Sequence, residues 1–565
     1  MPYFVKTRFY IFQYFMISHK KRGFFTNIPF LLLIEWDRKS VLRYLFLMKT
    51  HAKQLFWNAM LLTAASLLMR TVGVCFQVYL SARAGAEAMG LFSLLSGVYG
   101  FALTLATSGI HLGVTHLVVD AVTTGKPQRI LPSMKRATRY TLFFGCLASL
   151  LLFSLADPIG TLCLRDGRTV SSLRLLSLTL PLIALSSAWS GYFTAVRRPY
   201  KNAAVQVAEQ AIKIGATVYL LTAVFARDVE STCCALVAGG AVAEILSFLI
   251  DFLLYRLDRR KHFGKQDQDT GIAEGRRLLS ISLPIALTAY IRSGLITLQH
   301  ILIPHALRQS GSSHQAALIA YGSIQGMALP VILYPAALIS SFSGLLVPEL
   351  AEAEIQHSRR HVCYMISRVW SLSMLFSIGV AGILITFSTE LGNLLYPGTE
   401  AGYYIRILAP LIPIMYVDTA TDAMMKGLGE QVFSMKINIA DALISVVLVA
   451  FLIPNMGIRG YIATVYLSEL FNTVCSVTHL LRISKTPVRL LKWIYKPLIC
   501  IVCATALTRF CLSKTYFLFP KTVWALIANG ILLLLLYLLF LFFSGVLDRE
   551  DRGWIRGLLR KENEN

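Results

Sequence analysis

Apolar stretches long enough to cross a lipid bilayer recur from residue 55 to residue 546, with only short connectors between them. The hydrocarbon core of a bilayer is about 30 Å thick, and a helix needs about 20 apolar residues to cross it. The stretch 531–543 reads ILLLLLYLLFLFF, and the chain is 56% hydrophobic and only 15% charged. Inside a membrane each backbone N–H and C=O must be satisfied within its own segment, which favours helices. We therefore predict an all-α polytopic membrane protein.

The apolar sequence divides into about fourteen predicted transmembrane helices, separated by charged, glycine-containing or proline-containing connectors. Segments of about ten residues in which apolar and polar residues alternate, as in the strands of a membrane β-barrel, are absent from it. The expected spans are residues 55–80, 90–116, 138–156, 171–195, 203–225, 232–255, 279–304, 316–346, 362–388, 403–425, 431–453, 459–481, 491–511 and 522–545.

The net charge of +24 is concentrated in alternate connectors, and the intervening connectors carry far fewer basic residues. This alternation is the positive-inside pattern, so it predicts an even number of crossings with both termini in the cytoplasm of a cell membrane. The charge therefore reports topology, and we expect no nucleic-acid partner. The basic connectors are residues 126–139, 197–201, 256–277, 359–360, 426, 482–496 and 549–561.

Residues 1–47 do not follow the pattern of long apolar spans. They are rich in Phe, Tyr, Lys and Arg, and they lack the small-residue cleavage site of a signal peptide. Met48 immediately precedes the first predicted span. We predict that translation begins at Met48, and the alternative is an amphipathic arm on the membrane surface. A peptide from residues 1–40 in a mass spectrum of the native protein would refute the first interpretation.

The chain carries an internal repeat with a period of about six helices. The sequence Pro181-Leu-Ile-Ala-Leu in the fourth span matches Pro410-Leu-Ile-Pro-Ile in the tenth. In each copy a basic turn follows, and the next span carries an acid, Glu209 or Asp441. Because six is an even number, the two copies face the same way across the membrane. We predict two six-helix lobes, related as parallel repeats around a central cavity, followed by two C-terminal helices.

The repeat suggests boundaries along the chain. They give an N-terminal extension at 1–47, an N-lobe at 48–258, a cytoplasmic basic linker at 259–278, a C-lobe at 279–484, the last two helices at 485–546 and a cytoplasmic tail at 547–565.

Three motifs in the first two spans resemble a known family. They are Arg70-Thr-Val-Gly, then Ser81-Ala-Arg-Ala-Gly-Ala-Glu-Ala-Met-Gly-Leu-Phe-Ser-Leu, then Leu103-Thr-Leu-Ala-Thr-Ser-Gly-Ile. The family is that of stage V sporulation protein B, among the oligosaccharide flippases of the multidrug/oligosaccharidyl-lipid/polysaccharide (MOP) exporter superfamily, to which the lipid II flippases are related. The resemblance implies fourteen helices, two lobes around a central cavity, and translocation of lipid-linked glycans such as peptidoglycan precursors.

The chain departs from this family at two places. Phe76-Gln77 stands where the lipid II flippases carry an Arg-Asp pair, and His111 follows Ile110 where a proline is common. The resemblance therefore implies the class of transport and leaves the identity of the glycan open.

Two arginines occupy matching places within the spans, Arg70 in the first helix and Arg292 in the seventh. A charge at the bilayer centre costs about 3 kcal/mol or more, so each needs a partner or a wet cavity. Two facing guanidinium groups suit a diphosphate, which arginine holds through bidentate hydrogen bonds. We expect Arg70 and Arg292 to bind the substrate. The alternative for each is an interhelical ion pair or a hydrogen bond to backbone carbonyls.

Two further charge pairs lie within predicted spans. Glu209 and Lys213 are four residues apart, the spacing of an internal ion pair, and they are alternatively a gate or a cation site. Asp418 and Asp422 have the same spacing and the same sign, which favours a bound cation or proton. For these two, the alternative is pairing with a basic residue on another helix.

Signatures of enzymes are missing, since the chain has no Walker motif, no convincing metal-ligand cluster and no extramembrane segment large enough for a catalytic domain. We expect no enzymatic activity and no cofactor. The leading prediction is a transporter that flips a polyprenyl-diphosphate-linked oligosaccharide or peptidoglycan precursor from the inner to the outer leaflet by alternating access. Its expected partners are the lipid-linked saccharide, the bilayer and a coupling ion.

Two alternatives stay open. A cation-coupled multidrug antiporter of the same superfamily commonly uses an acid in its first span, and residues 55–80 contain none. A membrane scaffold without transport activity does not account for charges placed inside both lobes.

Overall fold

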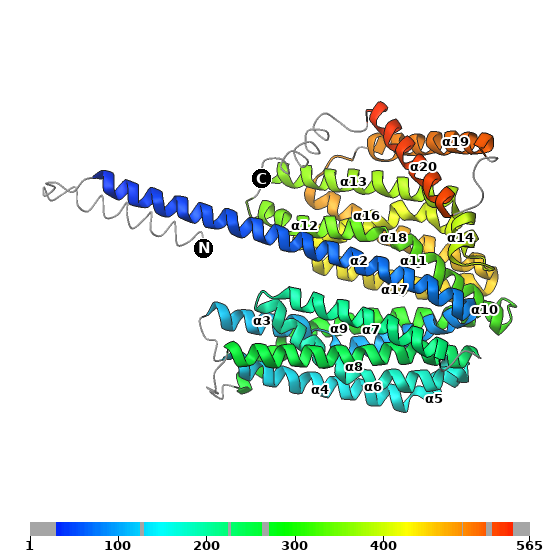
Figure 1. Cartoon of the computed structure of the whole chain (residues 1–565), viewed down its shortest axis with the longest axis horizontal. Helices are drawn as coiled ribbons and strands as arrows, with labels where there is room; N and C mark the ends of the chain where they lie inside the picture. Colours follow the sequence, from blue (N-terminus) through cyan, green and yellow to red (C-terminus); the bar gives the residue numbers. More distant parts are fainter. Residues whose placement is uncertain are drawn as a thin grey trace. The chain divides into compact units, whose positions relative to one another are not determined.

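The structure is a computed structural model that describes residues 30–124, 129–223, 228–262, 271–356, 358–488, 490–515 and 523–545. The chain forms two compact units, Met1–Leu62 and Thr63–Asn565. Within the described residues the regular elements are all helices (Figure 1), which confirms the all-α prediction.

The first unit is described only from Phe30, where helix α2 (Phe30–Thr107) begins. Of the predicted extension 1–47, residues 1–29 lie outside the described part, and residues 30–47 belong to α2. The start of translation at Met48 and the boundaries of the lobes stay predictions.

In the second unit, α2 to α8 form what we call the N-lobe. Gly85 interrupts α2 with φ 77° and ψ 169°, a backbone conformation that glycine alone adopts readily, and so divides α2 into two helices. Helix α6 packs against α3, α4 and α8, and α7 packs against α8. The bounds are α3 (Ile110–Thr123), α4 (Ile130–Ser154), α5 (Ala156–Pro158), η2 (Ile159–Cys163), η3 (Gly167–Thr169), α6 (Val170–Ala195), α7 (Pro199–Ala223) and α8 (Val229–His262).

Helices α9 to α18 form the C-lobe, in which α9 packs along α17, and α16 packs against α12, α13 and α18. Figure 1 shows α4, α6 and α8 running side by side in one group and α13, α16 and α18 in another. The bounds are α9 (Gly271–Gln309), α10 (His314–Tyr321), η4 (Gly322–Ala328), α11 (Leu329–Leu333), α12 (Ala336–Ile355), α13 (Arg359–Thr386), α14 (Ser388–Leu395), α15 (Ala401–Leu408), η5 (Ala409–Leu411), α16 (Ile412–Gly427), α17 (Gln431–Met456) and α18 (Ile458–Ser484).

The last helices pack on the outside of the C-lobe. Helices α19 (Lys496–Thr515) and α20 (Val523–Phe543) pack on each other and on α13, and the π-helical turn η6 (Leu491–Tyr495) precedes α19. A small apolar core joins them to α13, with Ile378, Ile501 and Tyr537 buried in it.

Among the described residues, twelve helical segments are long and apolar enough to cross a membrane, so the predicted count of fourteen is not confirmed. Helices α7 and α18 coincide with two predicted spans but are not among the twelve. Both carry several charged residues, including Lys201, Glu209 and Lys213 in α7, and Arg459 and Glu469 in α18. The predicted span 316–346 is divided at Tyr334 and Pro335 into two segments.

The two lobes meet at a contact between backbones, where α2 crosses α10 and η4. A Cβ atom added at Gly90 would lie 2.2 Å from the carbonyl oxygen of Leu318, and one added at Gly322 would lie 2.3 Å from that of Ala86. No side chain fits at either position, so the two glycines allow the helices to touch.

Candidate functional site

Two adjoining cavities lie between α2 and α7 of the N-lobe and α9, η4 and α11 of the C-lobe. The larger, which we call the neutral chamber, has a volume of about 590 Å³, and the smaller, the cationic chamber, has about 430 Å³. They share Gln77, Met89, Phe92, Pro330 and Leu333, so the two cavities are direct neighbours.

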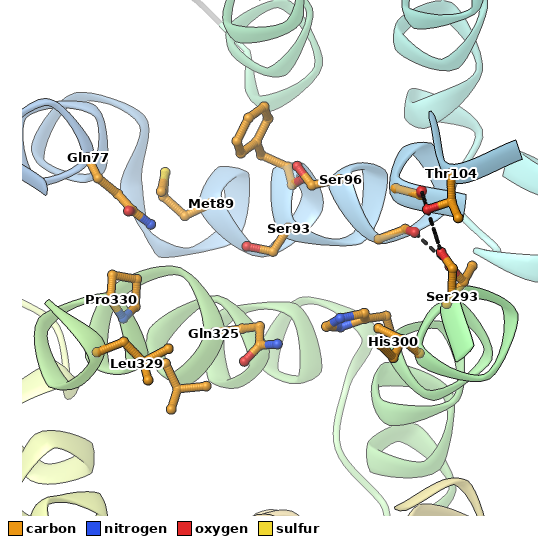
Figure 2. A pocket seen from close by; sticks show the side chains of 16 residues that line it. Gln77, Met89, Ser93, Ser96, Thr104, Ser293, His300, Gln325, Leu329 and Pro330 are labelled. Carbon is orange, nitrogen blue, oxygen red and sulfur yellow. Dashed lines mark hydrogen bonds between the residues drawn. The ribbon is translucent and has the colours of Figure 1, made fainter. Parts of the chain in front are cut away.

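Of the sixteen residues that line the neutral chamber, seven carry hydroxyl or amide side chains and six are apolar. In Figure 2, Met89 and Ser93 of α2 face Gln325 of η4 and His300 of α9 across the cavity. Its lining residues include no Asp, Glu, Lys or Arg. The full lining is Gln77, Met89, Phe92, Ser93, Ser96, Gly97, Gly100, Thr104, Ser293, Ile296, Thr297, His300, Gln325, Leu329, Pro330 and Leu333.

The cationic chamber contains two basic side chains, Arg70 of α2 and Lys213 of α7. Arg70, Gly73 and Gln77 lie on one face of α2 because they are spaced three and four residues apart. The hydroxyl groups of Thr71 and Tyr334 are 2.7 Å apart, and this hydrogen bond ties α2 to the junction of α11 and α12. The wall that presents Arg70 is therefore held in place by both lobes.

Neither cation in this chamber has a recorded carboxylate partner within 4.0 Å among the described residues. Lys213 is within electrostatic range of Glu209 and Glu244 without a direct ion pair to either. Both basic groups are thus available to an anion that enters the chamber.

Arg292 is not among the lining residues of either chamber. It lies in α9 within electrostatic range of Asp418 and Asp441, as expected from the packing of α9 along α17. The structure therefore brings Arg70 together with Lys213, and it brings Arg292 together with acids.

Those acids belong to a C-lobe acid cluster, which we define as Asp418 of α16, Asp441 of α17 and Glu469 of α18. The side-chain amide of Asn472 donates a hydrogen bond of 3.0 Å to Oδ2 of Asp418. Oδ1 of Asp418 and Oδ1 of Asn472 are buried without a hydrogen-bond donor among the described residues. Buried acceptors are normally satisfied, so this pair suits a proton or a bound cation.

Asp422 has a different environment from Asp418, although they lie one turn apart. Its Oδ2 is 2.6 Å from Nζ of Lys426, and Ser434 donates a hydrogen bond to its Oδ1. The basic partner is on the same helix, where the prediction considered one on another helix. Of the two aspartates, Asp418 alone retains an unpaired oxygen.

The N-lobe has a matching acid cluster, in which Glu244 and Asp251 of α8 each lie within electrostatic range of Glu209 in α7. Lys213 is the cation beside this cluster, as Arg292 is beside the C-lobe cluster. Glu244 and Glu469 occupy the sixth helix of their lobes, which extends the repeat seen in the sequence.

A polar network, which we call the end network, joins the lobes beside the Gly90–Gly322 contact. Arg168 binds Glu87 of α2 at 3.1 Å and Asp166 at 2.7 Å, and His314 of α10 lies 3.1 Å from the same aspartate. Gln315 of α10 also donates a hydrogen bond of 2.9 Å to Glu87.

Burial works to raise the pKa of Asp166, but hydrogen bonds from Arg168 and His314 outweigh it and hold the pKa below its usual value. The aspartate therefore stays ionised and keeps its two cationic or hydrogen-bonding partners. Sequence reasoning missed this network because its members come from three segments that only the tertiary fold brings together.

Comparisons with known proteins agree with this architecture. Residues 55–314 match the family described as polysaccharide biosynthesis protein. Stage V sporulation protein B of Bacillus subtilis (strain 168) is 26% identical over 416 residues, which cover 72% of this chain and 80% of that protein.

Solved structures share the fold at low sequence identity. The lipid II flippase MurJ, in an inward closed conformation, matches with a TM-score of 0.64 and 14% identity, covering 87% of this chain and 99% of that one. An inward-facing multidrug resistance MATE family transporter of the MOP superfamily matches with a TM-score of 0.57 and 11% identity, covering 74% and 96%.

The chain thus resembles polysaccharide biosynthesis proteins over residues 55–314, and its fold is that of solved membrane transporters. Its sequence is similar to that of stage V sporulation protein B, as the motifs between Arg70 and Ile110 predicted.

Proposed function

We propose that this transporter moves a polyprenyl-diphosphate-linked saccharide from the inner to the outer leaflet of the cell membrane by alternating access. The observation that supports the proposal is the cationic chamber, in which Arg70 and Lys213 face a cavity without carboxylate partners among the described residues. The names of its relatives point the same way, because one is a polysaccharide biosynthesis family and another is a lipid II flippase.

The diphosphate would bind in the cationic chamber. The guanidinium group of Arg70 offers a planar pair of N–H donors that matches two phosphate oxygens, and Lys213 adds a point charge that rotates to meet a third. Both interactions are stronger in a narrow cavity than in bulk water, because the surrounding dielectric constant is lower. The polyprenyl tail would remain in the bilayer while the headgroup crosses.

The end network supports a proposal for the direction of opening. The connector that contains Arg165 and Arg168 is one of those with few basic residues, and the positive-inside rule predicts that such connectors face outward. We infer that both termini are cytoplasmic and that the Gly90–Gly322 contact and the end network seal the cavity from the outside. Release of the substrate would require these contacts to separate.

The C-lobe acid cluster is our candidate for ion coupling. The free oxygens of Asp418 and Asn472 are arranged to accept a proton or a cation, and Arg292 balances part of the acidic charge. Occupancy there would change the charge between α9, α16 and α18, and so bias the packing of the C-lobe. In the N-lobe, a change in the charge of Glu209 would likewise alter the electrostatic environment of Lys213.

A multidrug antiporter is not favoured by this arrangement. A cationic drug would meet Arg70 and Lys213 in the cationic chamber, and like charges in a confined cavity repel each other. The described acids lie outside the lining of both chambers.

The test is a leaflet-resolved assay of lipid-linked precursors in cells that lack other flippases and are depleted of this protein. Cells with the wild-type chain should carry precursor in the outer leaflet, and cells with Arg70→Ala should not. Arg174→Ala is the matched control, because Arg174 is half exposed and pairs with Asp157 away from both chambers. Depletion without any effect on the outer leaflet would refute the proposed function, and full activity of Arg70→Ala would refute the role of Arg70.

A further inference from the structure

The neutral chamber offers hydrogen-bonding groups that the protein itself leaves unused. Among the described residues, the hydroxyl of Ser93 has no recorded partner, and Nε2 of Gln325 has none either. Gln77 donates its amide N–H to the carbonyl of Gly326 at 2.8 Å, which leaves its own carbonyl oxygen for the cavity. The chamber therefore presents both donors and acceptors.

His300 is held at the wall of this chamber in a fixed orientation. Its Nδ1 lies 2.7 Å from the hydroxyl of Tyr321, a fully buried side chain, so Nε2 remains for a ligand. Gly97 of α2 makes room for the ring, since a Cβ atom there would lie 3.0 Å from Cβ and 3.2 Å from Cδ2 of His300. The imidazole is thus positioned by contacts from both lobes.

This lining fits one class of ligand. A saccharide carries many hydroxyl groups, each a donor and an acceptor, and it binds to neutral polar groups without requiring a counter-charge. An acidic sugar would lose its hydration and find no basic side chain in the lining, which is unfavourable. Met89 and Phe92, which border both chambers, supply apolar surface for the C–H groups of a sugar ring.

We propose that the neutral chamber is the binding subsite for an uncharged saccharide attached directly to the diphosphate. This inference rests on the proposed function, because the diphosphate is taken to occupy the cationic chamber. The chambers share Gln77, Met89 and Phe92, so covalently adjacent parts of one headgroup reach both at once. Selectivity for an uncharged first sugar follows from the neutral lining.

The experiment measures binding to the purified full-length chain in lipid nanodiscs. The probes are undecaprenyl diphosphate, undecaprenyl diphosphate bearing N-acetylglucosamine, and undecaprenyl diphosphate bearing a uronic acid. The wild type should bind the N-acetylglucosamine lipid at least about fivefold more tightly than the other two, since each neutral hydrogen bond contributes a few-fold in affinity.

Ser93→Ala and His300→Leu should each weaken binding of the N-acetylglucosamine lipid by about fivefold and change binding of the sugar-free lipid less than about twofold. Ser93→Ala should fold normally, because the Ser93 hydroxyl makes no hydrogen bond to another group within the described structure. Arg70→Gln should weaken binding of all three lipids.

Equal binding of the three lipids by the wild type would overturn the saccharide subsite while leaving the proposed function intact. Equal losses for sugar-bearing and sugar-free lipids in the Ser93 and His300 variants would do the same. Failure of the wild type to bind any of the lipids would overturn the proposed function, and this inference with it.

Discussion

Both lobes carry an arginine and several acidic residues in matching helices, yet the two arginines have different surroundings. Each lobe places an arginine in its first helix and three acids in its later helices. In the N-lobe, Arg70 faces the cationic chamber, and in the C-lobe, Arg292 lies among the acids. The sequence repeat therefore places the two arginines in matching helices, but it does not give them the same surroundings.

The reason lies in the packing of the helices that carry the arginines. Helix α9 packs closely along α17, which brings Arg292 to Asp441. The corresponding part of α2 borders α7 at Gly73 and Gln210, which leaves Arg70 beside an open cavity. Arg70 lines the cationic chamber, whereas Arg292 lies outside both chambers, within electrostatic range of Asp418 and Asp441 but without a direct ion pair to either.

The largest effect is expected where the lobes touch. Gly322→Val should destabilise the protein by about 3 kcal/mol or more, because its side chain would overlap the carbonyl of Ala86. Gly100→Ala is the matched control in a helix with open space around it, and it should stabilise by up to about 1 kcal/mol. Thermal unfolding of the purified proteins compares the two. A stable Gly322→Val protein would show that the lobes do not pack as described.

The second prediction separates the two arginines directly. Arg70→Gln should weaken binding of undecaprenyl diphosphate by about 10- to 100-fold, since a hydrogen bond to a charged group contributes about 1.5–3 kcal/mol. Arg292→Gln should change it less than about threefold, because Arg292 lies outside both chambers. Equal losses would mean that both arginines reach the diphosphate, as the sequence suggested, and the contrast between the lobes would be lost.

Sequence reasoning predicted the helices and named both cations of the chamber, but it gave them separate roles. The predicted spans fall on helical segments, although the count of fourteen is not confirmed, because long apolar runs between basic connectors leave few other solutions. Arg70 was found because a charge in an apolar span stands out. Lys213 was predicted as a partner of Glu209 or as part of a gate or cation site, and the structure places it in the lining of the cationic chamber.

The neutral chamber could not be predicted from the sequence. Serine, threonine and glutamine are common in membrane helices, and Ser93, His300 and Gln325 come from three elements whose approach depends on Gly90, Gly97 and Gly322. Asp418 and Asp422 were treated alike since they share one helix face. The structure distinguishes them, because Asp422 pairs with Lys426, whereas Asp418 accepts a hydrogen bond from Asn472.

The third prediction concerns the acids of the C-lobe. Asp418→Asn should remove the dependence of transport on a proton or sodium gradient, because it removes the charge that the unpaired oxygens offer to a cation. Asp422→Asn should keep that dependence and lower stability by only about 0.5 kcal/mol, the usual contribution of an exposed pair at this spacing. Transport measured with and without an imposed gradient decides between them, and unchanged coupling in Asp418→Asn would exclude this cluster.

The smallest effect is expected at the end network. Glu87→Gln removes the ion pair with Arg168, which contributes about 1 kcal/mol, so opening of this end should rise by about fivefold. Hydrogen exchange of residues 314–322 reports the opening. Arg174→Gln breaks an ion pair elsewhere in the N-lobe and should leave that exchange unchanged. Equal exchange in all three proteins would show that the network does not hold this end closed.

The most direct test of the account is translocation by the purified full-length protein in proteoliposomes, with a labelled undecaprenyl-diphosphate saccharide as substrate. Wild type and Arg174→Gln should move the label from one leaflet to the other at the same rate, and Arg70→Gln should be at least about tenfold slower. No movement by the wild type, or equal movement by Arg70→Gln, would contradict the claim that Arg70 in the cationic chamber carries the diphosphate across the membrane.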